Sequence, residues 1–186
     1  AIIRFSYSTR DAILTSWEAA QLWWDWERHL GWRDPDGMAR FVETGNLILR
    51  TVGYDPVEML SLWDEIGVPY EDLDAAALRE RFPWLDTGRY HPPKRVDDPA
   101  FGDEATGELT AILSPNAGFI DDPMLAAENL AGAAARLGAE FRFHSEVVSI
   151  DRAGDGAVAG VTLSSGEVIG VPVVVNVAGP HSARVN

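Results

Sequence analysis

The chain has 186 residues, of which 46% are hydrophobic and 24% charged, a composition typical of a globular protein rather than a disordered one. Its formal net charge of −14 argues against binding to nucleic acid or to an anionic membrane surface, because both require clustered Lys and Arg side chains. The chain contains no cysteine, which excludes disulfides, thiolate catalysis and Cys-based metal sites. This fits a reducing compartment, and we expect a cytoplasmic protein.

We expect neither a signal peptide nor a membrane span. The first residues, Ala1 to Tyr7, show no basic segment followed by an apolar stretch. The longest apolar run, Val171 to Ala178, is much shorter than the roughly 20 residues that a membrane span needs. The chain has no initiating Met, and we expect it to be an internal piece of something longer.

A helix is predicted over residues 8–30. Ser8 and Asp11 have the spacing of a capping box at its start. Trp17 and Trp24 recur at helical spacing, which more often indicates core packing than an aromatic binding cage. Residues 38–52 follow as a predicted β-hairpin.

The hairpin is predicted from two short apolar runs, 41–43 and 47–49, which flank the turn-type residues 44–46. Two further helices are expected at residues 55–66, with Asp55 as the cap, and at residues 74–82.

Residues 86–107 are rich in Pro, Gly and Asp and predict a long surface loop. A strand is expected at 109–113. Asp122 then begins a helix that extends to Leu137. Its predicted inner face consists of small residues, Ala126, Ala127, Ala131 and Ala134.

The last third of the chain changes character, to short segments rich in β-branched residues. Five strands are predicted there: 141–143, 147–151, 158–163, 168–171 and 173–177. The last is apolar at nearly every position, which is typical of a strand buried on both faces of a parallel sheet. Residues 154–159 formally satisfy the G-x-G-x-x-A dinucleotide pattern, but strands are expected on both sides of them, so we interpret them as a hairpin turn.

No metal site is predicted, because the four histidines show no i,i+4 pair and no carboxylate cluster beside them. Arg4 stands between large apolar residues at the start of the chain. Such an arginine is either a partly buried anion clamp or a surface residue whose stem lies along apolar neighbours, and alone it favours the surface interpretation.

From residue 118 onward, five features occur in a fixed order: G-F-I-D-D-P with an alanine-rich helix, G-A, V-V-S-I, G-V-T-L-S-S-G, and V-V-N-V-A-G-P. This order closely resembles the D-amino-acid-oxidase-like FAD-dependent oxidoreductases, which include the sarcosine oxidases, glycine oxidase and dimethylglycine dehydrogenase. The opening I-I-R-x-x-Y at residues 2–7 resembles the sarcosine-oxidase branch in particular.

The resemblance implies an α/β (mixed α+β) fold, with part of an FAD-binding Rossmann-like domain that contains a β-meander, and part of a substrate-binding domain. It divides the chain into a flavin-proximal segment and helix at 1–37, a partial substrate domain at 38–117 and a partial FAD-binding domain at 118–186.

The resemblance also implies site residues. Arg4 matches the arginine that holds the substrate carboxylate, and Tyr7 matches an aromatic position near the substrate end of the flavin. Ala1 stands where such enzymes often have another basic residue, which puts sarcosine itself in doubt as the substrate.

For the cofactor, Val147 matches the residue whose backbone pairs with adenine. Ala178, Gly179 and Pro180 match the turn beside the pyrophosphate and the ribityl chain, where small residues permit close approach. His181 occupies a place often taken by Trp and receives no role.

The implied chemistry is transfer of a hydride equivalent from the carbon next to an amine to the flavin, with a small amine or amino acid as substrate. The family's G-x-G-x-x-G turn, its ribose-binding acid and its C-terminal half are not in this sequence. We therefore expect the isolated chain to bind FAD weakly or not at all and to be inactive, and its exposed sheet edges to favour self-association. Alternatives are an FAD-dependent dehydrogenase of a hydroxy acid or glycerol-3-phosphate, a tRNA-modifying flavoprotein, which the acidic charge disfavours, and a non-catalytic domain.

Overall fold

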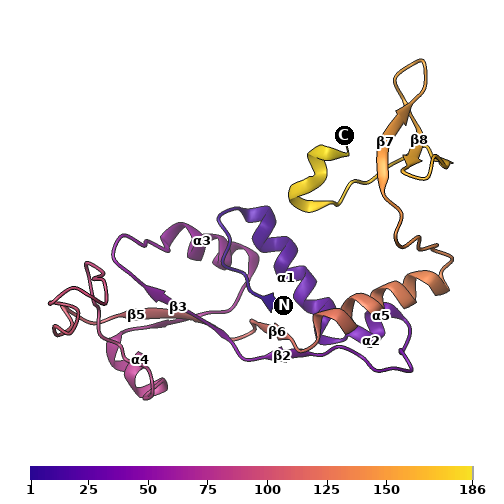
Figure 1. Ribbon diagram of the computed structural model, residues 1–186. Helices are drawn as coiled ribbons and strands as arrows, with labels where there is room; N and C mark the ends of the chain where they lie inside the picture. Colours follow the sequence, from indigo (N-terminus) through magenta and orange to yellow (C-terminus); the bar gives the residue numbers. More distant parts are fainter. Residues whose placement is uncertain (186) are drawn as a thin grey trace. The chain divides into compact units, whose positions relative to one another are not determined.

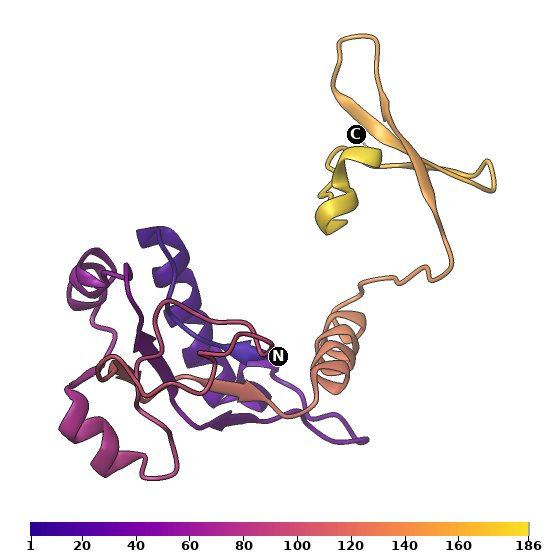
Figure 2. The same ribbon diagram turned by 60° about the vertical axis from the view of Figure 1, so that its left-hand side comes forward.

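The computed structural model describes residues 1–185, which form two compact units, residues 1–137 and residues 138–185. Each unit has its own sheets and helices (Figures 1 and 2). Among the described residues, no helix has the length and apolar character needed to cross a membrane.

The first unit contains five α-helices: α1 (Arg10–Trp24), α2 (Trp26–Leu30), α3 (Val57–Ile66), α4 (Ala75–Arg81) and α5 (Pro123–Arg136). Its strands are β1 (Ile2–Ile3), β2 (Phe41–Glu43), β3 (Asn46–Arg50), β4 (Glu71–Leu73), β5 (Thr110–Ser114) and β6 (Gly118–Ile120).

The strands of the first unit form two antiparallel sheets, in the orders β1-β6-β2 and β3-β5-β4. β2 and β3 pair with β6 and β5, so residues 41–50 run antiparallel to residues 110–120 through both sheets. Between the two sheets, the amides of Thr44 and Gly45 both donate to the Ala117 carbonyl, at 3.2 and 2.9 Å, which is the two-to-one pairing of a β-bulge.

The predicted hairpin over 38–52 is therefore wrong, although both of its strands exist. Gly45 has a φ of +76°, but it serves the bulge rather than a reversal of the chain. The chain passes straight through it, and each strand finds its partner about 70 residues away, which no local turn signal reveals.

β5 is buried on both faces, because its side chains alternate between them. Ile112 joins the core beneath α1 and α3, which also contains Phe5, Ile13 and Trp63. Ala111 and Leu113 face the other way and pack with Leu78 of α4. Figure 1 shows α3 and α4 on opposite sides of the β3–β5 pair.

The predicted helix over 8–30 is split in two at Asp25, whose φ and ψ of −133° and 60° are not helical. The capping box of Ser8 and Asp11 is wrong, because the helix begins later than its spacing requires and Thr9 occupies the N-cap without a side-chain hydrogen bond. Trp17 packs against the core as predicted, whereas Trp24 is 40% exposed and donates to Glu43.

The other helix ends follow their local signals more closely. Asp74, the first residue of the predicted third helix, caps α4 by accepting from the Ala77 amide. At the start of α3, Pro56 takes the N-cap in place of Asp55, whose carboxylate still accepts from the Val57 amide at 3.0 Å.

Asp122 caps α5 as predicted, by accepting from the amides of Met124 and Leu125. The predicted inner face of this helix is only partly correct. The buried positions are Ala126, Asn129 and Ala133, while Ala127 is exposed.

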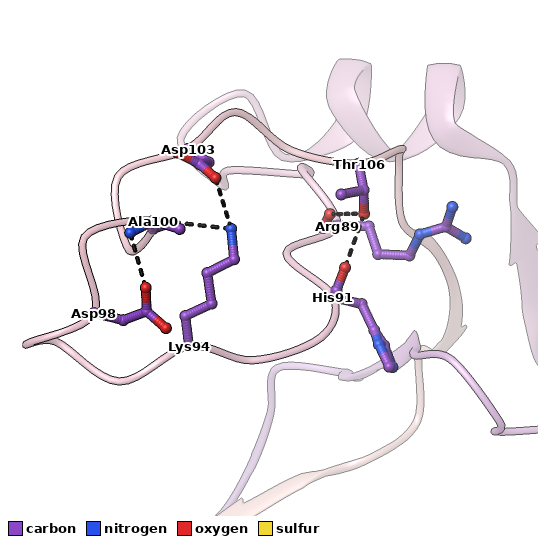
Figure 3. Close-up of polar contacts among 7 residues, drawn as sticks. All are labelled: Arg89, His91, Lys94, Asp98, Ala100, Asp103 and Thr106. Carbon is purple, nitrogen blue, oxygen red and sulfur yellow. Dashed lines mark hydrogen bonds and ion pairs between the residues drawn. The ribbon is translucent and has the colours of Figure 1, made fainter.

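The predicted surface loop between α4 and β5 is ordered by its own polar contacts (Figure 3). The Lys94 ammonium donates to the Ala100 carbonyl and to the Asp103 carboxylate, both at 2.9 Å. The Thr106 hydroxyl donates to the Arg89 carbonyl at 2.9 Å, which joins the two ends of the loop.

The second unit contains an antiparallel meander of β7 (Val147–Arg152), β8 (Val158–Leu163) and β9 (Val168–Gly170), followed by a short 3-10 helix, η1 (Gly179–Arg184). The turn between β7 and β8 includes Gly156, with a φ of +85°, so this glycine-rich sequence is a hairpin turn as predicted.

Two of the five strands predicted for this region are absent from the structure. Residues 141–143 form no strand, and His144 beside them adopts a left-handed φ of +56°, which ends an extended run. Residues 173–177 also form no strand, and Val173 and Val177 are 72% and 86% exposed. An apolar strand of this kind needs partners to cover it, and none of the described strands pairs with it.

Asn129 of α5 is fully buried and fixes the loop that leads into β2. Its side chain accepts from the Ala39 amide at 2.9 Å and donates to the Gly37 carbonyl at 2.9 Å and to the Asp34 carboxylate at 3.0 Å. One side chain thus satisfies three polar groups around a buried position.

Replacing Asn129 with Ala is expected to lower the free energy of unfolding by about 3 kcal/mol, because buried polar groups lose their partners. It should also remove protection of the Ala39 amide against hydrogen exchange. Urea unfolding and amide exchange of the variant, with Glu128→Ala as the control at an exposed position of the same helix, measure both effects. An Ala39 amide that exchanges in Asn129→Ala as slowly as in the wild type would contradict this role of Asn129.

Candidate functional site

The N-terminal segment brings two of the predicted site residues together. β1 pairs with β6 and ends directly before Arg4. The Arg4 guanidinium lies 5.5 Å from the centre of the Tyr7 ring, a cation–π distance. Phe5 between them is fully buried, so the core holds the segment while both polar side chains stay accessible to a ligand.

Beside Tyr7 lies a pocket of about 290 Å3 that the sequence did not predict. It is lined by Ser6, Tyr7, Ser8, Tyr54, Asp55, Glu58 and Met59. The aromatic rings and the two carboxylates offer favourable contacts to a positively charged or neutral amine, and no basic side chain lines the pocket.

The other pocket residues come from the first turn of α3 and from the two residues before its N-cap, about 50 positions away in sequence. They meet Tyr7 because α1 and α3 share one core with Phe5. The sequence predicted Asp55 only as a helix cap, and no pattern in the sequence indicates that it lines this pocket.

A second concave region lies within the second unit and is a groove of about 680 Å3. Val147 of β7 and Ala178 both line it. Gly179 and Pro180 begin η1 and are not among the lining residues. The strands beside the groove, β7 and β8, belong to an antiparallel meander.

Asn176 holds the turn that carries Ala178. Its side chain accepts from the Ala178 amide at 3.1 Å and donates to the Ser182 carbonyl at 2.9 Å. The sequence motif V-V-N-V-A-G-P contains this residue, but its spacing alone did not assign it a function.

The groove fits one end of FAD better than the whole molecule. Its walls are mainly valine side chains from β7, β8 and residues 174–177, which suits an apolar planar ring such as adenine. Arg184 and His181 supply the basic and polar character at the C-terminal side. The glycine-rich loop that cradles a pyrophosphate is not among the residues of this chain.

Asp121, the residue after β6, is held by several hydrogen bonds within the first unit. Its carboxylate accepts from the Arg40 amide and from the Arg40 Nε, both at 2.8 Å, and from the Asp122 amide at 2.8 Å. The hydrogen bond from the Arg40 amide, then that from its guanidinium, lowers the pKa of Asp121. This contact joins the start of β2 to the start of α5.

Within residues 1–185, no group of three or more His, Asp or Glu side chains is arranged to hold a metal ion.

The comparisons with known proteins place these features in a family. The model of the family described as FAD dependent oxidoreductase matches residues 1–186. No curated protein matches the sequence.

Three solved structures illustrate the likeness of fold. L-proline dehydrogenase from P. horikoshii has a TM-score of 0.69 at 21% identity, over 99% of this chain and 42% of its own. Glycine oxidase from Geobacillus kaustophilus has a TM-score of 0.64 at 25% identity, over 97% and 43%. NikD, an amino acid oxidase essential for nikkomycin biosynthesis, has a TM-score of 0.64 at 22% identity, over 100% and 41%. The chain spans less than half the length of each.

The lowered pKa of Asp121 predicts an acid-sensitive contact. A carboxyl whose pKa is lowered on folding stabilises the fold above its ordinary pKa, and this stabilisation is lost as the pH falls through the lowered value. Between pH 6 and pH 3, the urea midpoint of Asp121→Asn should therefore fall less than that of the wild type. Arg40→Ala should retain most of the wild-type fall, because the backbone amide is the larger cause. Equal falls in the wild type and Asp121→Asn would contradict this assignment.

Proposed function

Because the chain belongs to the FAD dependent oxidoreductase family, we propose that it is part of an enzyme that oxidises the C–N bond of an amino acid or an N-methyl amino acid. FAD, when bound, supplies the acceptor for the hydride equivalent. The residues of this chain bind and orient the substrate. The names of similar structures, which include glycine oxidase, L-proline dehydrogenase and an amino acid oxidase, support this substrate class.

The observation that carries the proposal is the pairing of Arg4 with Tyr7 beside a pocket. A guanidinium binds a carboxylate through two parallel hydrogen bonds, so Arg4 suits the carboxylate of the substrate. The amine then lies toward the pocket, where Asp55 and Glu58 favour positive charge. Tyr7 stands between the two regions and contributes to both.

The same pocket weighs against a hydroxy acid. A hydroxy acid would place its carboxylate at Arg4 equally well, but its hydroxyl would gain little from two carboxylates. An amine gains a Coulombic attraction there. This favours an amine as the oxidised group over the alternative of a hydroxy-acid or glycerol-3-phosphate dehydrogenase.

We place FAD contacts at Val147, whose backbone would pair with adenine, and at the turn of Ala178, Gly179 and Pro180. Their support is the groove that Val147 and Ala178 share, together with the left-handed φ of +56° at Gly179, which a glycine accommodates readily. In this proposal, residues 118–186 belong to the FAD-binding part, 38–117 to the substrate part and 1–37 to the region beside the flavin.

The role of Arg4 can be tested in the full-length flavoenzyme that contains these residues. Arg4→Gln is expected to raise the KM for an amino acid substrate by roughly tenfold or more, since it removes a charge-assisted pair of hydrogen bonds. The kcat/KM for the corresponding amine without a carboxylate should stay unchanged. Arg10→Gln is the control, because Arg10 is an exposed arginine of α1 that pairs with Glu65.

Retained flavin absorbance in both variants shows that they are folded. If Arg4→Gln oxidises the amino acid as well as the wild type does, Arg4 is not the carboxylate clamp.

A further inference from the structure

The carbonyl oxygen of Phe5 lies at the centre of the proposed substrate-binding segment and accepts two hydrogen bonds. One comes from the Tyr7 amide at 3.0 Å and closes a three-residue turn. The other comes from the indole Nε1 of Trp63, also at 3.0 Å, from 58 positions further along the chain. The turn lies between Arg4 and Tyr7, so its shape decides where both side chains point.

Trp63 is firmly held. It is fully buried on α3, within the same core cluster as Phe5, and Tyr70 packs at a ring distance of 5.8 Å. The amides of Gly67 and Val68 both donate to its carbonyl, at 2.8 and 2.9 Å, where α3 ends. Because neither the backbone nor the ring is free to move, the indole N–H has a fixed direction.

We propose that Trp63 is a positioning residue for substrate binding: its indole N–H fixes the turn at Phe5 and thereby holds Arg4 and Tyr7 in the arrangement that binds the carboxylate. This inference rests on the proposed function. Without the indole donor, the peptide between Phe5 and Ser6 keeps only its bond to the Tyr7 amide and is free to tilt. A small tilt is enough to misplace a guanidinium, because displacements of about 1 Å strongly reduce the efficiency of a binding site.

A second tryptophan provides a matched comparison. Trp17 of α1 contacts the ring of Phe5 edge-on, with the ring centres 5.0 Å apart and an interplanar angle of 89°. Trp17 therefore supports the side chain of Phe5, whereas Trp63 supports its carbonyl. Losing either indole weakens the core, but only the loss of Trp63 removes a hydrogen bond from the turn.

The experiment compares Trp63→Phe, Trp17→Phe and Arg4→Gln in the full-length flavoenzyme, with an amino acid and with the corresponding amine that lacks the carboxylate. Trp63→Phe should raise the KM for the amino acid by about tenfold, which corresponds to the net contribution of one hydrogen bond. The kcat/KM for the carboxylate-free amine should fall much less, because that substrate does not use Arg4 and feels the change only through Tyr7. Trp17→Phe should change the kcat/KM for both substrates by the same factor, or leave both values unchanged.

The outcomes separate this inference from the proposed function. The positioning role of Trp63 is overturned if Arg4→Gln raises the KM for the amino acid but Trp63→Phe does not. It is also overturned if Trp63→Phe changes the kinetics of both substrates equally. If Arg4→Gln itself has no effect, the proposed carboxylate clamp is wrong and the role of Trp63 falls with it. If Trp63→Phe loses its flavin, benzothienylalanine at position 63 replaces only the N–H by sulfur, and the same selective rise in KM is expected.

Discussion

The antiparallel pairing of residues 41–50 with residues 110–120 is the constraint on which the first unit depends. It fixes β6, with which β1 pairs. It also fixes β5, which packs against α1 and α3 on one face and against α4 on the other. Gly118 of β6 pairs with Glu43 of β2, and a Cβ there would collide with the Val42 carbonyl. The glycine of the G-F-I-D-D-P motif is thus required by strand pairing, whatever else that motif contributes.

The proposed site follows from this arrangement. Because β1 is fixed against β6, the chain enters the core at Phe5, and its neighbours on either side are left at the surface. α3 packs in the same core and brings Asp55 and Glu58 to the other side of Tyr7. A chain with a net charge of −14 thereby presents one arginine close to a pocket with two carboxylates, which is a polarity that suits an amino acid zwitterion.

Local signals in the sequence predicted local structure well. The cap at Asp122 is confirmed because a carboxylate next to the first free amides of a helix needs no tertiary information. The hairpin turn at Gly156 is confirmed for the same reason. In contrast, the partners of β2 and β3 lie about 70 residues away, and the turn-like residues around Gly45 serve a bulge instead.

The candidate site shows the same division. Arg4 and Tyr7 were named as site residues through a family resemblance, and the Arg4 guanidinium lies 5.5 Å from the centre of the Tyr7 ring. Tyr54 and Glu58 were not predicted, because their position depends on how α3 packs. The strand expected over 173–177 does not form. An apolar run indicates that a segment favours burial, but a strand also needs neighbouring strands to pair with it.

The most direct test of the central claim is a crystal structure of the full-length flavoenzyme with a small carboxylic acid that resembles the substrate but cannot be oxidised. We expect its carboxylate to lie against the Arg4 guanidinium, with the Tyr7 ring beside it and the rest of the ligand directed toward Asp55 and Glu58. A carboxylate bound to another cationic group, with Arg4 facing solvent, would contradict it.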